Sequence, residues 1–183
     1  TAALITNMDS PLGSAVGNSL EVIESVDILN GNTSGDLWTV CRELSCRMLM
    51  LAGIGDRDEC GRLVDEAVKS GEALKRFEMM VKLQGGDVSY IEDTSKFRKA
   101  SFSREVYAPA DGYITHMDSE KIGLTAVLLG AGREKKEDNI NHAAGIIIAA
   151  KTGDFVKRGE LLATLFADDE SRLDGAEFCF NRR

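Results

Sequence analysis

The sequence predicts a mixed α/β fold: the end of a parallel-sheet domain with its covering helices, followed by a β-rich module. A short apolar run at Ala2–Ile5 ends in turn residues, as a buried parallel strand does. Between residues 20 and 83, apolar residues recur at the three- and four-residue spacing of helices. After residue 100 they are β-branched or aromatic and alternate with glycine-containing turns. We therefore predict two parts, 1–99 and 100–183.

Four helices are expected in the first part, at Leu20–Leu29, Leu37–Leu51, Arg57–Lys69 and Glu72–Leu83. The second is the clearest. Its apolar face repeats every three or four residues, and Ser34 and Asp36 are suitable residues for a helix start. The glycine pair at Gln84–Asp87 interrupts the helical pattern, and the polar stretch Asp93–Lys99 is predicted to be a linker.

Strands and turns are expected on either side of one helix in the second part. The strand-forming stretches are "REVYAPADGYITHM" (104–117) and "GIIIAAKTGDFVKRGELLATLFA" (145–167). Glu120–Leu129 between them is predicted to be helical.

Composition narrows the classes of function. The chain has 183 residues and a net charge of -8, so it lacks the basic surface that binds nucleic acid or anionic membranes. Its four cysteines fit neither a zinc motif nor a secreted disulfide framework, and are expected to be reduced, mostly buried cytoplasmic thiols. No membrane span or signal peptide is visible. Because the chain starts at Thr1 directly in an apolar run, we expect a fragment.

Five blocks, in order along the chain, carry a family resemblance. They are "TAALITNMDSPLGSAVGNSLEV", "GDLWTVCRELSCRMLMLAG", "RFEMMVKLQGGD", "VYAPADGYI" and "LGAGREKKEDNINHAAGI". Together they resemble the C-terminal part of the pyrimidine-nucleoside and thymidine phosphorylases. The resemblance covers essentially the whole chain. Because several blocks agree in the same order, chance similarity does not explain it.

The resemblance implies an enzyme of nucleoside salvage. Such enzymes catalyse reversible phosphorolysis, in which phosphate attacks a pyrimidine nucleoside and yields the free base and (deoxy)ribose 1-phosphate. The family implies a cytoplasmic homodimer that needs no organic cofactor. Its phosphate- and base-binding residues precede the region that resembles this chain. We therefore expect no catalytic or substrate-binding residue here, and no activity from the chain alone.

The resemblance also implies a site for potassium or a similar monovalent cation. In "PLGSAVGNSLEVIE", the matching ligands are the main-chain carbonyls of Leu12 and Ala15 and the carboxylate of Glu24. Oxygen ligands suit a hard cation, and a glycine-rich turn can direct carbonyls inward. The alternative is that Pro11, Gly13 and Gly17 only form a tight connection from strand to helix, with Glu24 in solvent.

Two further motifs have simple structural interpretations. The sequence "GAGR" at Gly130–Arg133 could hold an anion, but a helix end followed by a loop explains it equally well. His116 and His142 have no second ligand or nucleophile nearby in the sequence, and we interpret them as ordinary surface or hydrogen-bonded residues.

A different class of function comes from the two strand-forming stretches of the second part. They resemble the halves of a biotinyl or lipoyl barrel-sandwich, so the second part is predicted to be barrel-sandwich-like. A non-catalytic carrier or interaction module is therefore the alternative to an enzyme fragment. Carrier domains present a modifiable lysine beside a methionine at a hairpin tip, and this chain has no such Met-Lys pair.

Overall fold

The computed structural model describes residues 1–133 and 135–181 and contains two compact units. The first, called the helical unit, consists of Thr1–Thr6 and Ile23–Lys96. The second, called the sheet unit, consists of Asn7–Val22 and the residues from Phe97 onward. The early segment Asn7–Val22 therefore groups with the residues from Phe97 onward.

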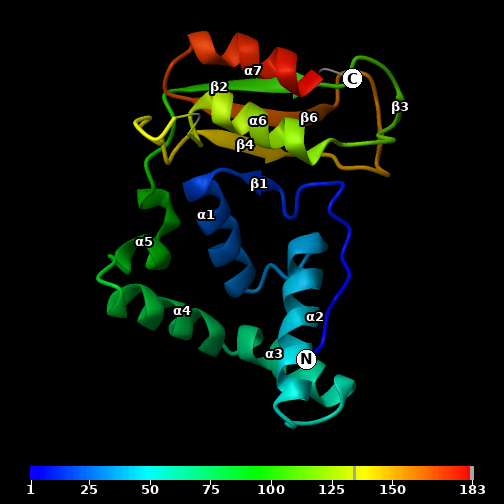
Figure 1. The fold of residues 1–183 in the computed structure, drawn as a ribbon, viewed down its shortest axis with the longest axis vertical. Helices are drawn as coiled ribbons and strands as arrows, with labels where there is room; N and C mark the ends of the chain where they lie inside the picture. Colours follow the sequence, from blue (N-terminus) through cyan, green and yellow to red (C-terminus); the bar gives the residue numbers. More distant parts are fainter. Residues whose placement is uncertain (134, 182–183) are drawn as a thin grey trace. The chain divides into compact units, whose positions relative to one another are not determined.

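The helices of the first part have nearly the predicted bounds (Figure 1). They are α1 (Asn18–Leu29), α2 (Gly35–Leu51), α3 (Arg57–Lys69) and α4 (Glu72–Leu83), followed by the short α5 (Ser89–Glu92) and a 3-10 turn at Thr94–Lys96. The predictions of these four longer helices are confirmed, whereas α5 and the 3-10 turn were not predicted. None of the helices described is both long and apolar enough to cross a membrane.

Local hydrogen bonds explain why α3 begins at its predicted residue. The carboxylate of Asp56 accepts a hydrogen bond of 2.9 Å from the Glu59 N–H, which satisfies one of the unpaired donors of the first turn. The helix then packs against α2, where Arg42 forms a bidentate pair with Asp65 at 2.5 and 2.7 Å. Sequence periodicity and capping therefore agree at this helix.

The sheet unit is built on a four-stranded antiparallel sheet with the order β1-β4-β6-β2. Its strands are β1 (Ala15–Val16), β4 (Gly145–Ile148), β6 (Leu161–Ala167) and β2 (Phe102–Tyr107). A separate antiparallel pair joins β3 (Gly112–Tyr113) to β5 (Phe155–Val156). Two helices, α6 (Ser119–Leu129) and α7 (Ser171–Asn181), complete this unit.

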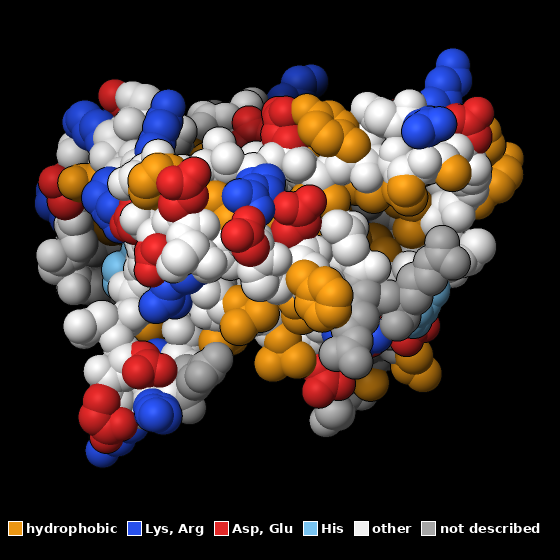
Figure 2. All heavy atoms as spheres, turned by 90° about the horizontal axis from the view of Figure 1, so that it is seen from above, with side chains coloured by type: hydrophobic (Ala, Val, Ile, Leu, Met, Phe, Trp, Pro, Cys, Tyr) orange, Lys and Arg blue, Asp and Glu red, His pale blue; other side chains and the backbone are white. Residues whose placement is uncertain are grey.

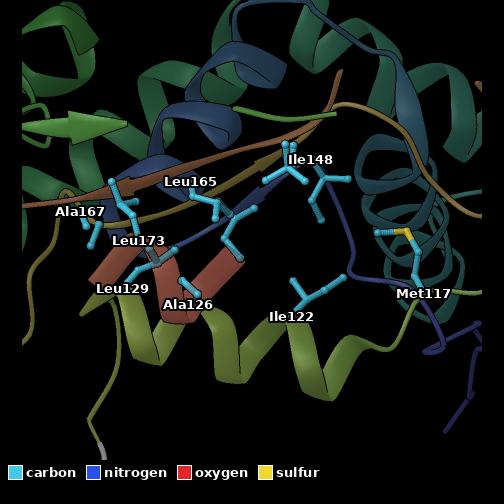
Figure 3. Packing of buried hydrophobic residues seen from close by; sticks show 13 residues of the cluster. Met117, Ile122, Ala126, Leu129, Ile148, Leu165, Ala167 and Leu173 are labelled. Atoms are coloured by element: carbon cyan, nitrogen blue, oxygen red, sulfur yellow. The ribbon is translucent and has the colours of Figure 1, made fainter. Parts of the chain in front are cut away.

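Both helices pack on one face of the four-stranded sheet and form the core with it (Figure 3). Ala126 and Leu129 of α6, together with Leu173 of α7, are turned toward the strand residue Leu165. Each of these side chains is at most 6% exposed. A layer formed by α6 and α7 therefore buries the apolar face of the sheet.

Two features of the predicted fold are not found. The predicted strand Ala2–Ile5 is irregular, and Ile5 is 98% exposed. All strand pairs described are antiparallel, so the parallel-sheet description is not confirmed. A strand needs hydrogen-bond partners from a neighbouring strand, and no described segment pairs with Ala2–Ile5.

The barrel-sandwich prediction is not confirmed either, because helices rather than a second sheet cover the core. Helix α7 was not predicted, and its composition explains this. Within "SRLDGAEFCFN" only Leu173 and Ala176 are buried, and the segment lacks a continuous apolar stripe. The sheet unit is therefore an antiparallel sheet with helices on one face.

Candidate functional site

The candidate cation ligands lie around the loop that leads into α1, called the connecting loop (Asp9–Gly17). Gly13 adopts a positive φ of 75°, a conformation that glycine reaches without steric cost. Leu12, immediately before it, is 47% exposed, whereas Ala15 in β1 is buried. Glu24 lies in the middle of α1, is half-buried, and belongs to the helical unit. The sheet unit thus contains two of the three candidate ligands, both in one loop.

The pairing of β1 with β4 determines where the Ala15 carbonyl points. Ala15 is opposite Ile147, and the Ile148 N–H donates a 2.7 Å hydrogen bond to the Ser14 carbonyl. In an antiparallel pair, residues alternate between hydrogen-bonded and non-hydrogen-bonded positions, so Ala15 occupies a non-hydrogen-bonded one. Its carbonyl is therefore directed away from β4, on the outer side of the edge strand β1.

The start of α1 is closed by a reciprocal pair of hydrogen bonds. The Gly17 N–H donates to the Glu21 carboxylate at 3.0 Å, and the Glu21 N–H donates to the Gly17 carbonyl at 2.9 Å. The second bond is the ordinary main-chain bond between residues four apart in a helix, whereas the first gives the Gly17 N–H, at the helix start, a side-chain acceptor. Glu21 therefore has a structural role, which is different from the role that the resemblance implies for Glu24.

Two glycines allow the connecting loop to approach β4 closely. A Cβ on Gly17 would lie 2.6 Å from the Ala144 carbonyl oxygen, and a Cβ on Gly145 would lie 2.4 Å from the Val16 carbonyl oxygen. Both glycines also have positive φ angles, of 149° and 153°. The backbones of β1 and β4 thus lie closer together at these two positions than a residue with a Cβ atom would permit.

The other candidate motifs have structural roles. Gly130, with φ 105°, ends α6, and its N–H donates to the Val127 carbonyl at 2.9 Å, so the interpretation of "GAGR" as a helix end is confirmed. His116 and His142 have exposed side chains. Within residues 1–133 and 135–181, no three His, Cys, Asp or Glu side chains form a metal-binding group.

The carrier alternative finds no support in the turns that bear lysine. Lys151 and Lys157 each begin a four-residue turn in the sheet unit, and neither has a neighbouring methionine. The ammonium of Lys151 donates a hydrogen bond to the main chain of the connecting loop. It is therefore not a lysine extended from a hairpin tip for modification.

A polar cluster that sequence reasoning missed lies at the end of the predicted linker. Asp168 accepts hydrogen bonds from the Ser101 N–H and from the Asn141 side-chain amide, both at 2.9 Å, and pairs with Arg98 at 2.6 Å. The Arg98 guanidinium, followed by the Ser101 donors, lowers the pKa of Asp168 to about 2. Asp168 lies 67 residues after Ser101 and 27 residues after Asn141, so no local pattern could indicate this cluster.

Surface charge is mixed rather than concentrated. Figure 2 shows acidic and basic side chains interspersed with hydrophobic ones on the face that it displays. On α7, Arg172 lies 3.8 Å from Asp169, and Arg104 of β2 pairs with Asp174 and Glu177. The face shown therefore has no continuous basic patch of the kind that binds phosphate backbones.

Comparison with known proteins identifies the family. Residues 113–180 match the family model described as the pyrimidine nucleoside phosphorylase C-terminal domain. The chain is 42% identical over 172 residues to the pyrimidine-nucleoside phosphorylase of Bacillus subtilis (strain 168), covering 93% of this chain and 40% of that protein. The chain belongs to the pyrimidine-nucleoside phosphorylase family. The resemblance drawn from the five sequence blocks is thus confirmed.

Other relatives in the pyrimidine-nucleoside phosphorylase family match the same extent of the chain. The Geobacillus stearothermophilus pyrimidine-nucleoside phosphorylase is 39% identical over 171 residues, which are 93% of this chain and 40% of that protein. The Staphylococcus aureus (strain N315) protein of the same name is 39% identical over 169 residues, which are 92% and 39% of the two chains. The chain therefore spans about 40% of the length of these curated relatives.

Proposed function

We propose that this chain is the C-terminal portion of an enzyme that catalyses reversible phosphorolysis of pyrimidine nucleosides. The observation that carries the proposal is its 42% identity, over 93% of its length, to a pyrimidine-nucleoside phosphorylase. In this proposal residues 1–99 end the α/β domain of the enzyme and residues 100–183 form its C-terminal module. Its ligands are phosphate and a pyrimidine nucleoside, its partner is a second copy in a homodimer, and its location is the cytoplasm.

The proposed reaction requires groups that this chain does not supply. Phosphate attacks the anomeric carbon as the bond to the base breaks, so the enzyme must provide cations and N–H donors around phosphate. It must also provide donors to the carbonyls of the departing base. The family resemblance assigns these donors to residues before the matched region. The contribution of this chain is structural support and the cation-binding loop.

Phosphorolysis by the chain alone and by a completed enzyme tests this proposal. The completed enzyme is a fusion in which the preceding residues of the B. subtilis relative are joined to Thr1. We expect no free thymine or uracil from the purified chain with phosphate and nucleoside, and release of base from the completed enzyme. Base release by the chain alone would refute the assignment of the donors. A folded but inactive fusion, beside an active B. subtilis parent, would refute the proposed function.

We further propose that the Leu12 and Ala15 carbonyls and the Glu24 carboxylate bind potassium in the complete enzyme. Three observations support this. The Ala15 carbonyl is directed away from β4, the exposed Leu12 precedes a glycine with positive φ, and all three proposed ligand atoms are oxygens. When bound, the cation supplies a positive charge that holds these oxygens in one arrangement.

Glu24→Gln in the completed enzyme tests the cation site. One negative charge is lost while an oxygen ligand remains, so we expect the potassium concentration for half-maximal activity to rise roughly tenfold, with the fold unchanged. Isothermal titration with potassium chloride should show the same shift. Glu21→Gln is the matched control, because glutamine at this position still accepts the hydrogen bond from the Gly17 N–H. Equal potassium dependence of the Glu24 variant and the parent would leave the loop as a tight turn only.

A further inference from the structure

The connecting loop is held in place by residues more than a hundred positions later in the chain. The Lys151 ammonium donates a 2.9 Å hydrogen bond to the Pro11 carbonyl. Next to it, the Ser10 hydroxyl lies 3.3 Å from the Thr152 hydroxyl. Both contacts come from one turn between β4 and β5, which we call the lysine turn (Lys151–Asp154). All of these residues belong to the sheet unit.

The backbone of the lysine turn is itself fixed, so the side chain of Lys151 starts from a defined point. The Lys151 N–H donates to the Asp154 carboxylate at 2.8 Å, and the Asp154 N–H donates to the Lys151 carbonyl at 3.0 Å. The Gly153 N–H also donates to the Ile114 carbonyl at 2.8 Å. The half-buried Lys151 side chain therefore extends from a rigid turn to the connecting loop.

Lys151 acts on the peptide group next to a proposed cation ligand. The Pro11 carbonyl and the Leu12 N–H belong to one planar peptide unit. A hydrogen bond to the Pro11 carbonyl therefore restricts the orientation of this peptide plane, and with it the backbone of Leu12. On the other side, the Ser14 carbonyl is bound to the Ile148 N–H at 2.7 Å. The Leu12 carbonyl thus lies between Pro11, which the lysine turn holds, and Ser14, which β4 holds.

We propose that Lys151 is a positioning residue for the monovalent cation, which orients the Leu12 carbonyl without being a ligand. This inference rests on the proposed cation site. The ammonium donates a hydrogen bond to the Pro11 oxygen, which is not among the assigned ligands. The C-terminal module then contributes to the cation site through the loop that it holds, because preorganised ligands bind without an ordering cost.

The chain contains a matched control for Lys151. Lys157 begins a second turn with the same pattern of lysine, any residue, glycine and acid, and its N–H donates to the Glu160 carboxylate at 2.8 Å. The Glu160 N–H donates back to the Lys157 carbonyl at 2.9 Å. Lys157 is exposed. Lys157→Met therefore removes the same charge from the same kind of turn.

Hydrogen exchange in the 183-residue chain tests whether Lys151 restricts the connecting loop. For Lys151→Met we expect the amides of Leu12–Val16 to exchange at least roughly tenfold faster, because a charged hydrogen bond is lost. Lys157→Met should leave these rates unchanged, and Lys151→Arg should restore most of the protection. The melting temperature checks that each variant folds. Equal exchange in Lys151→Met and the parent would overturn the inference.

Potassium titration of the completed enzyme tests the consequence for the cation. Lys151→Met should raise the half-saturating potassium concentration roughly tenfold, both in activity and in isothermal titration, with an unchanged rate at saturating potassium. Lys157→Met should titrate like the parent. A parent without any potassium response would overturn the cation site and this inference together. A responsive parent with an identical Lys151→Met titration would overturn this inference alone.

Discussion

Gly145→Ala is expected to destabilise the sheet unit by about 3 kcal/mol. The new Cβ would lie 2.4 Å from the Val16 carbonyl oxygen, and an alanine is strained at φ 153°. The closest clash is with a backbone atom, so no side-chain rotation relieves it. The strands β1 and β4 would have to separate, with loss of the hydrogen bond that ties Ser14 to Ile148. Urea unfolding followed by circular dichroism measures the change.

Gly175→Ala is the matched control for this prediction. Gly175 lies inside α7, and a Cβ there meets no atom within 4 Å. Alanine is the better helix former, so this variant should be as stable as the parent or more stable by up to about 1 kcal/mol. If Gly145→Ala were as stable as Gly175→Ala, the close approach of β1 to β4 would be wrong.

Asp168→Asn is expected to lower the free energy of unfolding by about 2 kcal/mol near neutral pH. Asparagine retains one acceptor for the Ser101 N–H, but its amide nitrogen cannot accept from Asn141 or pair with Arg98. Asp169→Asn is the control, because the Asp169 side chain accepts hydrogen bonds from the nearby Ser171 and its ion pair is with the exposed Arg172. That variant should change the free energy of unfolding by less than about 0.5 kcal/mol.

The same cluster predicts how stability depends on pH. In the folded chain the pKa of Asp168 is about 2, below its ordinary value of 3.8, so the folded state binds this proton less readily than the unfolded state does. The stabilisation is complete above about pH 4 and is lost as the pH falls toward 2. It is about 1–2 kcal/mol, because Arg98 is largely in solvent. The Asp168→Asn variant should lose less stability than the parent between pH 5 and about pH 2; equal losses would contradict the assignment.

Sequence alone was sufficient for the helices whose determinants are local. The stripes that predicted α3 and α4 depend on residues three or four positions apart, and a carboxylate cap such as Asp56 acts within one turn. The family was also readable from the order of its motifs along the chain, and the identity to the relatives confirmed it. In the candidate site, sequence and resemblance supplied the ligand residues, and the role of these residues stays a prediction.

Only the tertiary structure decided features that join distant parts of the chain. The segment Ala2–Ile5 has the composition of a buried strand, yet a strand forms only where another strand supplies hydrogen bonds. The orientation of the Ala15 carbonyl depends on β4, about 130 residues later, and the hold on Pro11 depends on Lys151. Helical hydrogen bonds close within four residues, whereas strand pairs and side-chain clusters such as that of Asp168 form between residues that the sequence places far apart. Local patterns therefore determined the helices, while the three-dimensional fold determined the sheet, its edges and the shape of the connecting loop.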